Sequence, residues 1–425
     1  MTQNISYINK IKTILPQMVE WFNLFSTIYL IATFITSFDY QRPAIYTYFI
    51  STFLDIITNQ RYLNNKWHKA KITFIVMIIF YGCIWIWHAF EQCNSNGFFH
   101  STDTRLPFLA FGTIGLLCNI NPKIKIKHIT YTMLITSIAS ITYIALKKYD
   151  ILFAPTITLE TFRTLLPLIR HELLHVTHIE YNLYLNCTMT MCFIYCLDNN
   201  KKLEKIIFII GITIIYLTLL LNEGRTGLLT ATILFFIFSF ITIYYYRPKL
   251  LLPTIIVVTT ITTLFINGHD RFNFDNIEKD PRNVIWKTST EIIKEKPILG
   301  YGVCRGREIF IERTANNPEL NNFWTMWYTF CPTYNKNRFH CHNAFLESTI
   351  EFGLLGLILS ISIFLLPILL TKNKRQLYLS FFILIFIIQA MFESFTFHYQ
   401  IILFCWLLNF FINTKLSDKK LRHLM

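Results

Sequence analysis

The first pattern with recognisable chemistry is HELLH at residues 171–175, in which two histidines stand one helical turn apart. This H-E-x-x-H spacing is that of the zinc-binding helix of metalloproteases. A catalytic zinc site also needs a third protein ligand and an open position for water. The metzincin continuation would place Gly at 178 and His at 181, but the chain has His178 and Tyr181. The motif alone is therefore weak support for a metal site.

Three interpretations of this segment stay open: a metal site, an interfacial helix whose polar residues face lipid headgroups, and a part in substrate binding. The motif lies beside Arg170 and just outside an apolar run, whereas intramembrane proteases hold it within a span. We expect an interfacial helix at 171–175, no bound metal, and substrate binding by His178 and Tyr181.

A second candidate is Arg225, which stands between two apolar runs with almost no loop around it. An ionisable residue at such a junction is costly and is a functional candidate by default. The alternative is an arginine that reaches the phospholipid headgroups. Gly224 and Gly227 would let another group approach closely.

A third candidate lies in a predicted helix that follows Asp280. Asp280 suits the N-cap, Pro281 suits the first helical position, and Pro297 would stop the helix. Arg282 is unfavourable there, because a cation in the first turn opposes the helix dipole. We expect a nearby anion, either Asp280 itself or a bound phosphate.

A fourth candidate is the cluster His340, His342 and Asn343, just before a long apolar run. A neutral imidazole at a water–membrane boundary can act as general base. Two histidines two residues apart point to opposite sides of a strand and about 200° apart on a helix, so a metal pair is not expected. Glu347 and Glu351 follow, and the alternative is a set of interfacial polar residues that caps the span.

Composition sets the frame for these candidates: the 425 residues are 53% hydrophobic and only 15% charged. Apolar runs of about 20 residues, the length that crosses a bilayer as helix, recur along the whole chain. The predicted fold is therefore an all-α polytopic membrane protein, forming a single integral membrane domain over residues 1–425. We predict twelve spans, near 19–37, 43–59, 72–91, 106–120, 128–146, 179–198, 206–222, 226–245, 251–267, 343–370, 377–393 and 396–413.

The basic residues give the topology. With both termini in the cytoplasm, the inner segments carry 21 Lys and Arg and the short outer loops only 7, Arg105 and Arg170 among them. The positive-inside rule favours this orientation. The net charge of +14 then reflects topology and contact with anionic lipids, and nucleic-acid binding is not expected.

The longest segment outside the predicted spans, 268–342, is a large loop on the outer side of the membrane between spans nine and ten. Its three tryptophans, at positions 286, 324 and 327, suggest a folded piece that lies on the membrane. A disulfide such as Cys304–Cys331 can form there if the compartment is oxidising.

The stretches around Arg225 ("RTG"), 282–302 ("R-x-x-x-W" and "KPILGYG") and 340–356 ("HCHNAFLESTIEFGLLG"), in this order, resemble the O-antigen ligase and O-antigen polymerase superfamily. The similarity covers roughly 205–370, and the span layout extends it to the whole chain. "THIEYNLYLN" at 177–186 is also similar to a His-Tyr stretch in many members.

The resemblance implies a GT-C-like bacterial inner-membrane enzyme. Such enzymes are inverting, metal-independent glycosyltransferases that need no cofactor. They move a glycan from an undecaprenyl-diphosphate carrier to an acceptor hydroxyl at the periplasmic face. Carried over by motif, Arg225 and Arg282 bind the donor diphosphate and His342 is the base, with His340, Asn343, His178 and Tyr181 as further substrate contacts.

Several functions remain open within and outside this class. A ligase would use a lipid A-core acceptor, a polymerase would use a growing glycan, and a protein glycosyltransferase is a third variant; we favour the ligase. A transporter of lipid-linked glycans would need ionisable residues near mid-span, but the predicted spans are nearly free of charge. The metalloprotease hypothesis depends only on the HELLH motif.

Overall fold

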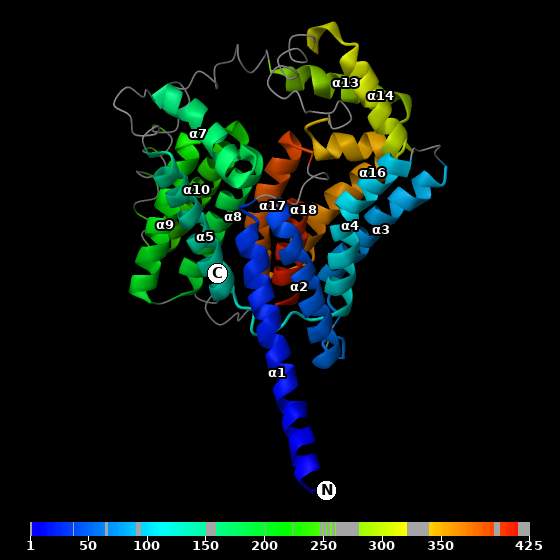
Figure 1. Cartoon of the computed structure of the whole chain (residues 1–425). Helices are drawn as coiled ribbons and strands as arrows, with labels where there is room; N and C mark the ends of the chain where they lie inside the picture. Colours follow the sequence, from blue (N-terminus) through cyan, green and yellow to red (C-terminus); the bar gives the residue numbers. More distant parts are fainter. Residues whose placement is uncertain are drawn as a thin grey trace.

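The computed structural model describes residues 2–36, 38–63, 67–90, 95–149, 159–199, 201–222, 224–246, 280–320, 340–394 and 400–414, with single positions at 249, 252, 256 and 260. Helices are the only regular elements in these ranges, and most lie side by side in one bundle (Figure 1). They are α1 (Thr2–Thr33), α2 (Phe38–Thr58), η1 (Lys69–Lys71), α3 (Ile72–His88), α4 (Ser95–Leu117), α5 (Ile126–Lys147), α7 (Leu159–Leu174), α8 (His178–Asp198), α9 (Lys202–Leu221), α10 (Arg225–Tyr246), α13 (Pro281–Glu295), α14 (Val303–Ala315), η4 (Pro318–Leu320), α16 (Ala344–Leu369), α17 (Asn373–Phe392) and α18 (Gln400–Asn413).

Eleven of the twelve predicted spans coincide with helices, while 251–267 lies almost wholly outside the described residues. Six helical segments in the described ranges are long and apolar enough to cross a membrane, which supports the predicted polytopic class. The total of twelve stays a prediction. The six are Lys69–His88, Ile126–Lys147, Lys202–Leu221, Arg225–Tyr244, Ala344–Leu369 and Asn373–Phe392.

Two helices form the interior of the bundle. Every residue of α8 from Tyr181 to Ile194 is buried, and so is every residue of α18 from Gln400 to Ile412. Helix α8 packs against α5, α9, α10 and α17, so its polar side chains face other helices. A helix that is covered on all sides belongs in the core of a bundle.

The helices outside the predicted spans gather at one end. Helices α7, α13 and α14 lie at the end of the bundle opposite the N-terminus (Figure 1). The N-cap prediction for α13 is confirmed, because the Asp280 side chain accepts a hydrogen bond from the Arg282 backbone N–H at 3.0 Å and the helix begins at Pro281. Ile285 and Ile292 of α13 pack with α14 and α16 in a small second core.

The backbone of 297–302 is docked onto a kink in α16 at Gly353. The Gly302 N–H donates to the Glu351 carbonyl at 2.8 Å, and the Leu354 N–H donates to the Pro297 carbonyl at 2.8 Å. Gly353 has φ 61°, and a Cβ there would lie 2.2 Å from the Ile298 carbonyl oxygen. These backbone hydrogen bonds join two of the stretches that carry the family resemblance.

Two arginines assigned to short outer loops lie in buried helical positions, so their assignment to loops is wrong. Arg105 is within α4 and has no exposed surface, and its Nη2 bonds both carboxylate oxygens of Glu351, at 2.9 and 2.7 Å. Arg170 is within α7 and is 2% exposed. A buried guanidinium is tolerated when it is paired, and apolar periodicity alone gave no sign of these pairs.

Cys304 takes part in a disulfide, as the sequence suggested for this loop. Its partner lies outside the described residues, as do Trp324, Trp327 and Cys331, so the pairing with Cys331 stays a prediction.

Candidate active site

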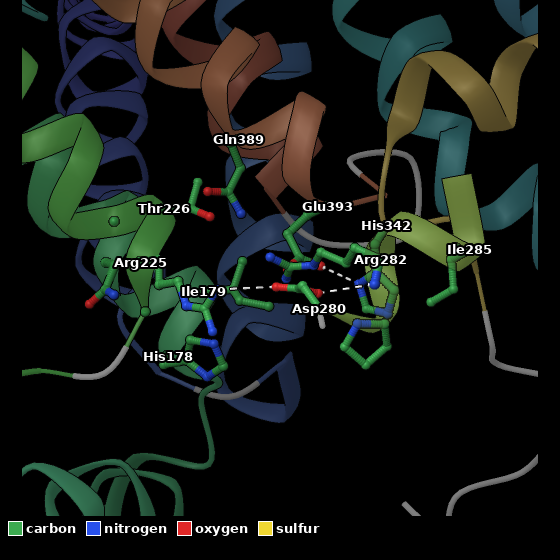
Figure 2. A pocket seen from close by; sticks show the side chains of 14 residues that line it. His178, Ile179, Arg225, Thr226, Asp280, Arg282, Ile285, His342, Gln389 and Glu393 are labelled. Atoms are coloured by element: carbon green, nitrogen blue, oxygen red, sulfur yellow. Dashed lines mark hydrogen bonds and ion pairs between the residues drawn. The ribbon is translucent and has the colours of Figure 1, made fainter. Parts of the chain in front are cut away.

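A cavity of about 380 Å³ opens where α8, α10, α13 and α17 come together. Four of the seven predicted site residues line it: His178, Arg225, Arg282 and His342 (Figure 2). They come from segments up to 164 positions apart in the chain, as the difference between 342 and 178 shows. The other lining residues are Ile179, Asn182, Gly224, Thr226, Gly227, Asp280, Pro281, Ile285, Gln389 and Glu393.

His178 is the first residue of α8, and a capping box formed by Thr177 and Glu180 surrounds it. The Thr177 side chain accepts from the Glu180 N–H, and the Glu180 carboxylate accepts from the Thr177 N–H. Such a cap fixes the first turn of a helix and hence the position of His178. Both the carboxylate and the backbone N–H of Glu180 are thus engaged at the helix end.

The two glycines beside Arg225 make room for Asn182. A Cβ at Gly224 would lie 2.6 Å from the Asn182 Nδ2, and a Cβ at Gly227 would lie 2.5 Å from the Asn182 Cβ. Asn186, one turn further along α8, donates to the Gly227 carbonyl at 3.1 Å. The close approach expected at these glycines is therefore the packing of α8 against the start of α10.

Arg170 of α7 stabilises the contact between α8 and the start of α10. Its Nη1 donates to the Asn222 Oδ1 at 2.6 Å, and the Asn222 Nδ2 donates to the Asn182 Oδ1 at 2.6 Å. The guanidinium also lies over the Tyr181 ring, 5.5 Å from its centroid. A chain of buried hydrogen bonds thus connects α7 to Asn182, against which the two glycines beside Arg225 pack.

Each cavity arginine contacts a carboxylate. Arg225 Nη1 lies 3.2 Å from the Asp280 Oδ2, and Arg282 Nη2 lies 2.7 Å from the Glu393 Oε1. The Asp280 carboxylate therefore caps α13 with one oxygen and holds Arg225 with the other. The sequence analysis expected Asp280 or a phosphate as the anion beside Arg282, and it did not foresee Glu393, which contacts the guanidinium.

Glu393 also holds His342. Its Oε2 lies 3.0 Å from the His342 Nδ1, and the Glu393 side chain is only 4% exposed. Burial on its own raises the pKa of Glu393, but the hydrogen bond from His342 and the charges of His342, Arg282 and His178 outweigh it and leave the pKa lowered. The carboxylate is therefore ionised and can fix the imidazole orientation.

The two histidines of the HCH sequence lie together, which corrects the expectation that they point apart. Their ring centroids are 4.3 Å apart, and the His340 Nδ1 accepts from the His342 N–H at 3.3 Å. His342 has φ 50°, so the backbone here is neither strand nor helix and the usual side-chain periodicity fails.

Three predicted substrate contacts do not line the cavity. Tyr181 is 2% exposed and bonds Ser140 at 3.1 Å. Asn343 caps α16, with its Oδ1 accepting from the Phe345 and Leu346 N–H groups at 3.0 Å. His340 contacts the ring of His342 but is not among the lining residues. Helix packing and capping account for Tyr181 and Asn343.

The HELLH segment shows no metal centre. His171 and His175 are exposed, and Glu172 pairs with Lys148 at 2.8 Å. Among the described residues, the one group of three metal-ligating side chains is His340, His342 and Glu393. The geometry thus gives the metalloprotease hypothesis no support.

The comparison with known families bears on the predicted resemblance. Residues 208–361 match the family model described as O-antigen ligase. The match confirms the predicted resemblance to this superfamily over these residues. No curated protein matches the chain. The O-antigen ligase domain contains Arg225, Arg282 and His342, whereas His178 and Glu393 lie outside it and complete the cavity from α8 and α17.

Sequence reasoning missed Glu393, the double role of Asp280 and the role of Arg170. For Glu393 a signal was present, because it is a single carboxylate at the junction of two apolar runs and deserved the same weight as Arg225. Arg170 stood next to the motif that drew attention to the segment.

Proposed function

We propose that this protein is an inverting, metal-independent glycosyltransferase. It would move a glycan from an undecaprenyl-diphosphate carrier to an acceptor hydroxyl at the periplasmic face of the inner membrane. The acceptor we favour is lipid A-core, which makes the protein an O-antigen ligase. The observation that carries this proposal is the convergence of Arg225, Arg282 and the Glu393-held His342 on one cavity of an O-antigen ligase domain.

The arginines suit a leaving diphosphate. Its negative charge grows in the transition state, so fixed cations beside it lower the barrier. Arginine offers a planar, always-protonated fork for phosphate oxygens. The Arg225 and Asp280 side chains are 36% and 22% exposed, so that pair can exchange a carboxylate for a phosphate at modest cost.

The histidine suits deprotonation of the acceptor. With its Nδ1 toward Glu393, the His342 ring has its Nε2 as the remaining nitrogen to accept a proton from a hydroxyl. Ionised Glu393 then stabilises the imidazolium that forms. The acceptor oxygen attacks the anomeric carbon, the bond to the diphosphate breaks, and the carrier diphosphate leaves with the bonding electrons.

The test is purified full-length protein in lipid nanodiscs with an undecaprenyl-diphosphate-linked glycan and lipid A-core. We expect glycan-modified lipid A-core and free carrier diphosphate, at a rate that EDTA does not change. Absence of transfer to any lipid-linked or glycan acceptor would refute the glycosyltransferase assignment.

A repeat-unit polymerase is the second candidate, because the matched family leaves the acceptor open. Deletion of the gene in its host separates the two. Loss of all long chains with accumulation of carrier-linked glycan indicates a ligase, whereas decoration with single repeats indicates a polymerase.

A further inference from the structure

We propose that His340, His342 and Glu393 form an inhibitory site for a divalent transition-metal ion, for which zinc is the best fit. One ligand atom from each residue lies within 4.8 Å of the other two. The inhibitory part of this inference rests on the proposed function, because the ion would occupy the base. The binding part does not.

The donor set selects the metal. Two imidazole nitrogens and one carboxylate oxygen match the nitrogen and oxygen ligands of three-residue zinc sites, which leave the fourth position to water. Magnesium prefers an octahedron of oxygens and is a poor match for two imidazoles. The cavity lined by His342 and Glu393 provides an opening through which an ion and its water can enter.

Zinc binding would require the three ligand groups to move closer together. Ligand atoms about 2.0–2.2 Å from a tetrahedral zinc lie about 3.3 Å apart, so the three groups would close by up to about 1.5 Å. His340 and His342 come from one tight turn whose rings are already in contact, and Glu393 follows the end of α17. Side-chain rotation supplies such a movement without displacing a helix.

Arg282 limits the affinity. It contacts Glu393 through Oε1, at 2.7 Å, so the metal would bind Oε2 in place of the hydrogen bond between Oε2 and the His342 Nδ1. The charge of Arg282 repels a dication. The site would therefore hold zinc more weakly than a resident catalytic centre does. Reversible inhibition follows, because a metal on His342 or Glu393 removes the proton acceptor or its partner.

The test is calorimetric titration of zinc chloride into the purified full-length protein, without substrate, at pH 7.5 and pH 5.5. We expect binding at pH 7.5 and weaker binding at pH 5.5, because protons compete for the imidazoles. His340→Gln should weaken binding by at least the roughly 10–100-fold that loss of an outer-shell partner costs. His171→Gln is the matched control, since it removes an exposed histidine of the HELLH segment and should leave zinc binding unchanged.

Three results would overturn the proposal: no zinc binding at pH 7.5, equal affinity in His340→Gln, or loss of binding in His171→Gln. The last would place the metal at the HELLH segment instead. The inhibitory part is tested by transferase rates with and without zinc, each variant relative to its own zinc-free rate. Zinc binding in a protein without transferase activity would refute the proposed function and leave the site standing.

Discussion

The carboxylate of Glu393 accepts from the His342 Nδ1 through one oxygen, at a distance of 3.0 Å, and its other oxygen contacts Arg282. The expected base and one of the expected diphosphate ligands are thus held by a single side chain that follows α17. A change at Glu393 should affect both roles, which makes it the most informative position in the cavity.

Glu393→Gln should lower kcat by at most the roughly 10²–10⁴-fold expected for loss of a positioned base in His342→Ala. The rate should fall because the amide of glutamine is neutral and no longer stabilises the imidazolium or fixes the ring orientation. Initial rates of the wild type and the variants measure this effect. Glu308→Gln removes an exposed carboxylate that pairs with Arg305 and is the control. An unchanged kcat in Glu393→Gln would mean that Glu393 does not act through His342.

Ionised Glu393 should also make folding acid-sensitive. Its folded-state pKa is lowered, so its contribution to stability is complete above the ordinary glutamate pKa of about 4.3 and is lost as pH falls through the folded value. The melting temperature of the wild type in detergent should therefore fall more steeply below about pH 4.3 than that of Glu393→Gln. Parallel curves for the two proteins would contradict this.

Arg225→Lys and Arg282→Lys keep the positive charge and remove the planar fork. If each guanidinium binds diphosphate oxygens in the transition state, each substitution should cost about 10²–10³-fold in kcat, as loss of an oxyanion donor does. Arg313→Lys, in the exposed pair with Glu295, is the matched control and should retain the wild-type rate. Wild-type turnover by either cavity variant would remove that arginine from the proposed site.

The limits of sequence reasoning show at particular residues. The helices were predictable because their apolar runs have spanning length, and α13 because Asp280, Pro281 and Pro297 mark its ends. The side-chain hydrogen bonds of Arg105 to Glu351, Arg170 to Asn222 and Arg282 to Glu393 were not predictable, because the two residues of each pair lie at least 52 positions apart in sequence. The adjacency of His340 and His342 depends on one positive φ angle that no periodicity encodes.

Arg170→Gln should impair both folding and transfer. It breaks the bond to Asn222, which holds Asn182 against the start of α10, which carries Arg225. A lost hydrogen bond to a charged group costs about 1.5–3 kcal/mol, so the melting temperature should fall. Arg170→Lys should recover part of the stability, and His171→Ala, an exposed neighbour, should be nearly silent in both measurements. Full activity and stability in Arg170→Gln would show that Asn182 and the start of α10 stay packed together without this chain of hydrogen bonds.

Gly353→Ala tests the backbone contact between 297–302 and the kink of α16. Its φ of 61° and ψ of −148° lie in a region almost exclusive to glycine, where another residue costs about 1–3 kcal/mol. The added Cβ would also lie 2.2 Å from a backbone oxygen that cannot rotate away, so part of the contact between 297–302 and α16 must open. We expect a lower melting temperature and slower transfer, because α13 precedes this turn and carries Arg282. Gly82→Ala is the control, because, apart from the backbone of its own helix α3, no heavy atom of the described residues would lie within 4 Å of an added Cβ, and it should be neutral or slightly stabilising. Equal melting temperatures for the two variants would mean that the α16 kink does not depend on glycine.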